Sequence, residues 1–192
     1  MNALIMGRPS DDTAQACAQR LREDGMTVVL TSADRAVADA RELSAGAGLD
    51  VLVTCPEMRL DGSIESTPEA AFRELLAVNL TAAFRVGREC FEAMRTQGAG
   101  SMIHIASDAG IRAAHETAAF SVMSAGLIAL AELFAAEGSP HGIRSNAVCP
   151  RSGTDVAAIV AWLASEESAH LSGATLRVDG AAGAAMVLDT RI

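Results

Sequence analysis

The side chains best suited to chemistry in this sequence stand close together, at Ser107, Asp108 and His115. A serine hydroxyl, an imidazole and a carboxylate are the nucleophile, the general base and the orienting acid of a catalytic triad. A triad is defined by its geometry, however, and a loop histidine is more often an ordinary surface residue. The sequence therefore leaves two interpretations of His115 open: a base beside Ser107 or a surface side chain.

Two residue types that many mechanisms need are missing from the chain. It contains no tyrosine, and all 15 of its basic side chains are arginine, so it contains no lysine. A phenol acid, a Schiff base and a P-loop lysine are therefore excluded. The cysteine spacing does not match a zinc site, so we expect no metal and four buried, reduced thiols. These are Cys17, Cys55, Cys90 and Cys149.

The chain is acidic, with 24 Asp and Glu residues against 15 basic residues and a net charge of −9. It lacks a basic patch, so neither nucleic acid nor an anionic membrane surface is an expected partner. The longest uncharged apolar stretch, 117–131, is shorter than the ~20 residues that span a bilayer. The start of the chain does not resemble a secretory signal, and we expect a single cytoplasmic domain, 1–192.

Short apolar segments alternate with helical ones along the whole chain, and these elements must position the polar groups. Strands that are apolar throughout are typical of a parallel sheet covered by helices on both faces. The expected fold is α/β, a doubly wound parallel sheet (Rossmann-like) with about six strands. The expected strands are 3–6, 27–31, 50–54, 101–106, 143–148 and 175–178, and the expected helices are 10–24, 35–43, 67–95, 118–136 and 154–164.

A ligand of such a sheet binds outside the carboxyl ends of the strands. Gly7, Cys55, Ser107 and Pro150 each follow an expected strand, so they mark the expected cleft. His104 lies within a strand, between two isoleucines, and we expect it to be packed against a helix.

Three segments resemble the short-chain dehydrogenase/reductase family. They read Gly-Ser-Met-Ile-His-Ile-Ala-Ser-Asp-Ala-Gly at 100–110, Ala-Ala-Phe-Ser-Val-Met-Ser-Ala-Gly at 118–126 and His-Gly-Ile-Arg-Ser-Asn-Ala-Val-Cys-Pro at 141–150. The segments 50–53, 78–80 and 173–180 fit the same pattern, so the resemblance runs nearly from end to end. It implies the doubly wound fold and NAD(P)-dependent oxidoreduction by a catalytic Asn, Ser, Tyr and Lys.

Only half of the catalytic set that the resemblance implies is present. Asn79 and Ser107 stand at the first two positions, whereas Phe120 and Ser124 stand at the positions of the tyrosine and the lysine. Carbonyl reduction needs a proton donor for the developing alkoxide, and a phenyl ring has no proton to give. Loss of general acid catalysis typically costs about 10²–10⁴ in rate. We therefore expect a degenerate family member, a pseudoenzyme without standard redox activity.

The loop that the resemblance assigns to cofactor binding is also altered. In the family, three glycines let the backbone approach a pyrophosphate at a helix N-terminus. Here Gly7 remains, whereas Asp11 and Thr13 take the other two positions. We expect Asp11 and Asp12 to cap the helix, where their charges repel a phosphate that Arg8 attracts only in part. No cofactor is therefore expected, and Gly7 is a residual family position.

Three further departures from the family pattern affect the cleft and the sheet. The family's Asn-Asn-Ala-Gly after the third strand reads Thr-Cys-Pro-Glu at 54–57, and the proline removes a backbone donor. The strand and helix that the family inserts after its second strand are missing. We therefore expect 27–31 to be a sheet edge and the strand order to be 2-1-3-4-5-6. The long substrate lid after the fifth strand is missing as well.

Three functions are compatible with these residues. The first is a non-catalytic or partner subunit that acts through its surface. The second is a cleft reused for a non-redox reaction of the isomerase, cyclase or lyase type on a small apolar substrate, with Ser107, Asn79 and His115 as its polar groups. The third is an NAD(P)-dependent oxidoreductase with an atypical proton donor, for which His115 is the first candidate.

The long apolar helix predicts assembly, because an apolar helix must be covered on all sides. In the resembled family two such helices pack against their symmetry mates as a four-helix bundle. We therefore expect a homodimer through 69–95 and 118–136, with Ala125, Leu130 and Phe134 on the exposed face. A heterodimer with an active relative would use the same face.

Overall fold

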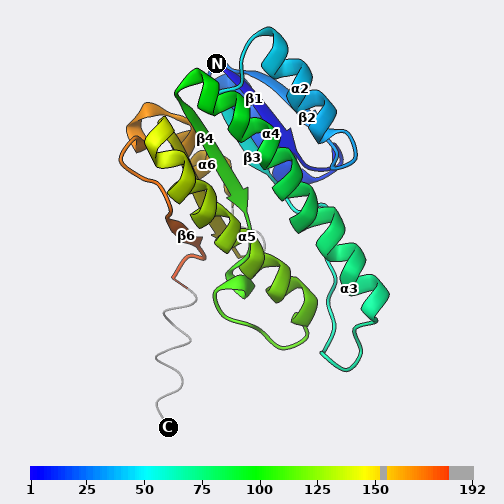
Figure 1. Ribbon diagram of the computed structural model, residues 1–192. Coiled ribbons are helices and arrows are strands. Elements are labelled where there is room, and N and C mark those ends of the chain that lie inside the picture. The colour runs from blue at the N-terminus through cyan, green and yellow to red at the C-terminus, as the bar shows by residue number, and fades with distance from the viewer. Residues whose placement is uncertain (152–154, 182–192) are drawn as a thin grey trace.

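The computed structural model describes residues 1–151 and 155–181, which form a six-stranded parallel sheet with helices on both faces (Figure 1). The strand order is β2-β1-β3-β4-β5-β6. This confirms the expected doubly wound fold, its strand order and the edge position of β2. The strands are β1 (Asn2–Met6), β2 (Thr27–Thr31), β3 (Val51–Thr54), β4 (Gly100–Ile105), β5 (Ile143–Pro150) and β6 (Thr175–Val178).

Two sets of helices enclose the sheet, with α2, α4 and α5 on one face and α1 and α6 on the other. Figure 1 shows α4 and α5 side by side in front of the sheet and α6 behind it. Residue 154, where the last helix is expected to begin, lies outside the described residues. The helices are α1 (Asp12–Glu23), α2 (Ala36–Gly46), α3 (Glu69–Leu75), α4 (Ala82–Gln97), α5 (Ala118–Gly138) and α6 (Ala157–Ala164), and the short turns are η1 (Leu76–Thr81), η2 (Asp108–Gly110), η3 (Ser139–His141) and η4 (Glu166–Ser168).

The sheet separates two hydrophobic cores. In β1, Leu4 and Met6 belong to the core under α4 and α5, whereas Ala3 and Ile5 belong to the core under α1 and α6. Successive side chains of a strand point to opposite faces, and both faces are covered here. Each strand must therefore be apolar in both directions, which is why the strands read as continuous apolar runs.

The first helix begins and ends where its sequence signals predict. The Asp11 side chain caps α1 by accepting the N–H of Ala14 at 2.9 Å, which confirms the expected capping role. Gly25, with φ at +83°, follows the end of the helix. Gly7 is needed beneath the helix, because a Cβ there would lie 2.9 Å from the Ala14 Cβ and 3.0 Å from the Cys55 Cβ.

Two expected helix boundaries are wrong. The single helix expected over 67–95 is α3, the π-helical turn η1 and α4 in succession. Thr67 does not cap it: its hydroxyl donates to the Ser63 carbonyl at 2.6 Å, and Pro68 is the residue before the first turn. In the other case, the helix expected over 35–43 continues as α2 to Gly46. Alanine and serine tolerate helix well enough for packing on the sheet to extend it.

The apolar helical segment that contains α5 extends beyond the uncharged stretch 117–131. By length and composition alone, Ala118–His141 is a helix that could cross a membrane, but 56% of its most apolar window is buried inside the protein. It packs against β4 and β5 and forms much of one core. These contacts are those of a core helix.

His104 is a buried polar group in the middle of the sheet. As expected, it is packed against a helix, with its ring stacked on Phe134 at a centroid distance of 5.7 Å. Its Nδ1 lies 2.9 Å from the Thr54 hydroxyl, and its Nε2 has no hydrogen-bond partner among the described residues. Burial lowers the pKa of His104 to about 4. The imidazole is therefore neutral in the folded protein.

We predict that this histidine makes the fold sensitive to acid. The unfolded chain binds a proton near pH 6.5 and the folded chain only near pH 4, so stability falls as the pH drops between these values. At pH 5 the loss is about 2 kcal/mol, since each pH unit below 6.5 costs about 1.4 kcal/mol. Urea unfolding at pH 7 and pH 5 measures it.

The double variant His104→Phe/Thr54→Val should lose this part of the pH dependence, because it removes both polar partners together. His141→Gln, at an exposed histidine, should keep it. An equal loss of stability in all three proteins would contradict the prediction.

Candidate functional site

A cavity of about 380 Å3 lies at the carboxyl edge of the sheet. Cys55, Ser107 and Pro150 meet there, as expected, and Gly7 lies in contact with Cys55 below. The sequence therefore located the cleft correctly. Its lining consists of Asp11, Thr13, Cys55, Pro56, Glu57, Met58, Arg59, Ile105, Ala106, Ser107, Phe120, Pro150, Arg151 and Val156.

Ser107 lines this cleft, but its hydroxyl is engaged locally. The residue follows β4 in extended conformation and caps the turn η2, where its Oγ accepts the N–H of Ala109 at 3.2 Å. The same hydroxyl donates to the Asp108 carboxylate at 3.3 Å. Ser107 and Asp108 thus form a turn cap, in which the Asp108 carboxylate orients the hydroxyl.

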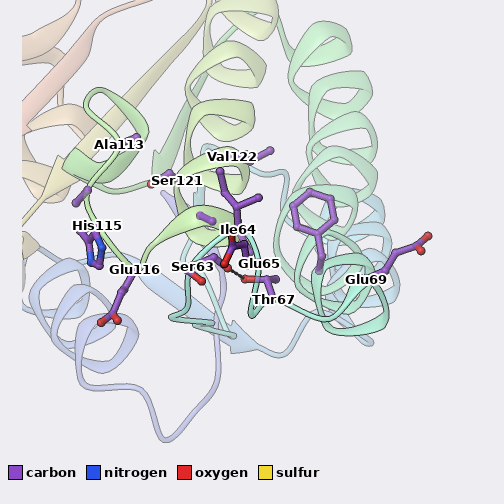
Figure 2. A pocket seen from close by; sticks show the side chains of 14 residues that line it. Ser63, Ile64, Glu65, Thr67, Glu69, Ala113, His115, Glu116, Ser121 and Val122 are labelled. Atoms are coloured by element: carbon purple, nitrogen blue, oxygen red, sulfur yellow. Dashed lines mark hydrogen bonds between the residues drawn. The ribbon is translucent and has the colours of Figure 1, made fainter.

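His115 lies elsewhere, in the lining of a second and larger pocket of about 790 Å3. Figure 2 shows His115 and Glu116 on one side of this pocket and Glu69 on the opposite side. Ile64 and Val122 lie between the two sides. Ser107 and His115 line different pockets. The loop 111–117 carries His115 toward the start of α5, and the surface interpretation of this residue fits its exposure.

Phe120 forms one wall of the cleft at the position of the family tyrosine. It is 7% exposed, and the Arg59 guanidinium lies over its ring at 5.0 Å from the centroid. Arg59 is also paired with Asp61 at 3.0 Å. The ring therefore serves as a platform for a cation, a contact that sequence reasoning missed because the two residues are 61 positions apart.

Ser124, at the position of the family lysine, lies in closed space. It is fully buried, and its hydroxyl has no hydrogen-bond partner in the described part of the chain. The turn η2 packs directly on it: a Cβ at Gly110 would lie 2.7 Å from the Ser124 backbone and 2.8 Å from its Cβ. The turn η2 and the helix α5 are therefore closely packed at this position.

Asn79 is retained as a structural clamp. It sits in the π-helical turn η1, 1% exposed, and its Oδ1 accepts the backbone N–H groups of Glu57 and Met58 at 2.8 and 3.1 Å. Its Nδ2 donates to the Met58 carbonyl at 2.6 Å. The amide thus holds the loop after β3 in place, and both of its ends are occupied.

Glu57 is the functional side chain that sequence reasoning undervalued. Its carboxylate crosses to the loop after β2 and accepts the N–H of Ala33 at 2.6 Å. Burial raises the pKa of Glu57, and the Ala33 hydrogen bond and the Arg8 charge oppose that shift. The only signal in the sequence is a glutamate where the family pattern has glycine, and it gives no hint of the partner.

The four cysteines are free and buried, as expected. Hydrogen bonding to Cys17, together with burial, raises the pKa of Cys55, and burial raises the pKa of Cys149 to about 12. These thiols are therefore protonated at neutral pH and are poor nucleophiles. Within residues 1–151 and 155–181, no three His, Cys, Asp or Glu side chains are grouped in a way that could hold a metal ion.

A family model described as short chain dehydrogenase matches residues 2–161. The chain belongs to this family. The resemblance read from the sequence is thus confirmed, and the family is one of oxidoreductases. An NAD+-bound xylitol dehydrogenase of known structure has the same fold, with a TM-score of 0.82 at 17% identity over 92% of this chain and 97% of that one.

Curated relatives are similar over part or most of their length. An uncharacterized oxidoreductase of Thermotoga maritima is 35% identical over 102 residues, which span 53% of this chain and 41% of that protein. An acetoacetyl-CoA reductase of Allochromatium vinosum is 27% identical, over 80% of this chain and 74% of the relative. The 3-oxoacyl-acyl-carrier-protein reductase MabA of Mycobacterium tuberculosis is 28% identical, over 88% of this chain and 87% of the relative.

We predict opposite effects of two substitutions at the old lysine position. Ser124→Lys should lower the free energy of unfolding by about 3 kcal/mol or more, because it overpacks the contact with Gly110 and buries a charge. Ser124→Ala should be neutral or slightly stabilising, because it removes a hydroxyl that lacks a partner. Urea unfolding followed by circular dichroism measures both.

The matched control is Glu137→Lys, which introduces the same side chain at an exposed site near the end of the same helix. Its effect should stay within about 0.5 kcal/mol. Wild-type stability in Ser124→Lys would mean that the turn η2 moves easily off α5.

Proposed function

We propose that this short-chain dehydrogenase family member is a non-catalytic or partner subunit without redox activity. The observation that carries the proposal is the wall of the cleft at α5, where Phe120 has no proton to donate and Ser124 lies under Gly110. Neither a phenol nor an ammonium group exists elsewhere in the chain to replace them. Hydride transfer to a carbonyl then lacks its general acid.

The residues at the carboxyl edge also do not fit a nicotinamide dinucleotide. Asp11 and Thr13 stand at two glycine positions and line the cleft, and the Asp11 side chain already takes the Ala14 N–H at the N-terminus of α1. That N-terminus is where the pyrophosphate of a bound dinucleotide would lie. A carboxylate about 4 Å from a phosphate costs on the order of 4 kcal/mol at an effective dielectric of ~20. The proposed function therefore involves no nicotinamide cofactor.

The reactive alternatives have less support. A non-redox isomerase, cyclase or lyase would have Ser107 as its polar group in the cleft. Both ends of the Asn79 amide are hydrogen-bonded, and His115 lines another pocket. For an oxidoreductase with an atypical donor, His115 would have to act from that other pocket. A partner role needs neither residue.

A partner subunit needs a surface, and α4 and α5 provide an apolar one. Phe84, Val122 and Leu133 are 48%, 53% and 59% exposed, and Ala125 and Ala129 lie exposed on the same side of α5. Two residues expected on this face are instead inside: Leu130 and Phe134 are each 8% exposed because they point into the core. Exposed large apolar side chains next to small ones suit a close helix–helix contact. We propose a homodimer through this face, or a heterodimer with an active relative.

We predict that neither NADH nor NADPH binds with micromolar affinity and that simple ketones and aldehydes are not reduced. Nicotinamide fluorescence or calorimetry measures binding, and nicotinamide absorbance measures turnover. The variant Phe120→Tyr/Ser124→Lys should remain inactive as well, since the cleft still carries Asp11. An active family member with its own tyrosine and lysine is the positive control. A saturable micromolar titration of the unmodified protein would contradict the proposed function.

We predict that light scattering at micromolar concentration gives about twice the monomer mass of 19.8 kDa. The variant Val122→Glu/Leu133→Glu should be monomeric, because it places charges in the centre of the contact. Ile111→Glu, at a side chain that is 39% exposed and lies outside both helices, should leave the mass unchanged. A monomer of the unmodified chain would exclude the stable homodimer. Formation of a mixed dimer with an active relative would then support the heterodimer.

A further inference from the structure

We propose that Glu57 is an internal bridge that closes the crevice over β1, so that its own carboxylate takes the anion position that a bound nucleotide would use. The proposal rests on the proposed function in one respect, that the unmodified chain binds no dinucleotide. It goes further by assigning the closure to one side chain.

The order of the strands places this bridge over the carboxyl end of β1, in the path of a ligand that extends from β3 to β2. β1 lies between β2 and β3 in the sheet. Glu57 follows β3 and Ala33 follows β2, so their hydrogen bond of 2.6 Å passes over the end of β1. Neighbouring strands are about 4.8 Å apart, so the bridge spans two strand spacings. It thus covers the crevice where the chain winds in opposite directions from β1, which is where ligands of doubly wound sheets bind.

Hydrogen bonds hold both the backbone and the carboxylate of Glu57. The Asn79 amide accepts the N–H of Glu57 at 2.8 Å and fixes the backbone from below. At the other end, Ala33 donates its N–H to the carboxylate. Since Asn79 is buried, the position of Glu57 is set before any ligand arrives. A preorganised side chain of this kind does not need to be ordered at a further cost.

The cleft that Glu57 lines is separate from the pocket at the end of β2. The cleft of about 380 Å3 has Glu57 in its lining and includes no residue of the loop after β2 within the described part of the chain. Thr31, Ser32 and Arg35 line a different pocket, which shares no residue with the cleft. In a dinucleotide site the ribose lies at the end of the second strand and the pyrophosphate at the first turn. The Glu57–Ala33 hydrogen bond joins the loops that follow β3 and β2, across the end of β1.

The charges around the bridge identify the ligand class that it replaces. Arg8 and the Ala33 N–H both favour the ionised form of Glu57, whereas burial and the carboxylates of Asp34 and Asp11 oppose it. A cation and a backbone N–H at the end of a strand suit an anion, and Glu57, which accepts that N–H, supplies the anion from within the chain. Removal of the carboxylate should therefore admit an anionic nucleoside diphosphate, such as ADP-ribose.

Calorimetric titration with ADP-ribose tests the proposal. Glu57→Ala should bind at least about tenfold more tightly than the unmodified chain, since a like charge is removed and the Ala33 N–H is released. Glu57→Gln keeps the shape and loses the charge, so its affinity should lie between the two. The control Glu65→Ala removes an equal charge from an exposed position outside the crevice and should change nothing. If Glu57→Ala gains no affinity, Asp11 and Thr13 suffice to close the crevice and the bridge is not the cause.

Amide hydrogen exchange gives a second readout that does not depend on a ligand. The Ala33 N–H should exchange at least about tenfold faster in Glu57→Ala, whereas the Gly7 N–H, which donates to the Thr31 carbonyl, should keep its rate. An unchanged Ala33 rate would overturn the bridge itself. NADH binding by the unmodified chain would instead contradict the proposed function, so the two failures are distinguishable.

Discussion

A sheet of six parallel strands with helices on both faces leaves polar side chains few places to lie. Most polar groups inside it find a partner within the sheet or its covering helices, as the Thr54 hydroxyl and the His104 Nδ1 do for each other. Polar side chains that bind or react with a ligand must therefore lie at the ends of the strands. The carboxyl edge is therefore the place where changes in sequence can alter function without disturbing either core, and the departures from the family pattern are found there.

The changes at this edge share a physical character. Groups that would face a ligand in an open cleft are bonded to, or packed against, other parts of the same chain. Asn79 holds a loop, Ser107 caps a turn, Glu57 bridges two loops and Phe120 lies under a guanidinium. Together these contacts engage the polar groups of Asn79, Ser107 and Glu57 from within the chain. They support the proposal of a subunit that acts through its surface.

Most of the fold could be read from the sequence because each strand is apolar on both faces and each crossover begins and ends with recognisable turn signals. The strand order followed from the resemblance to the family, once the strand and helix missing after the second strand were taken into account. The rest depends on contacts between distant positions. Neither the π-helical turn at Asn79 nor the reach of Glu57 to Ala33 has a local sequence signal, because tertiary packing and a hydrogen bond over 24 positions create them. The place of His115 depends on the path of a loop, which side-chain chemistry alone does not determine.

The contact between Gly110 and Ser124 also constrains how such a protein can evolve. While the turn lies against the helix, a Cβ at Gly110 would meet Ser124 at 2.7 to 2.8 Å. On the proposed function, a lysine at position 124 would require the turn to move first, because overpacking such a contact is destabilising. Recovery of the family chemistry would then take coordinated substitutions at Phe120, at Ser124 and in the turn η2, whereas the outer surface can change one residue at a time.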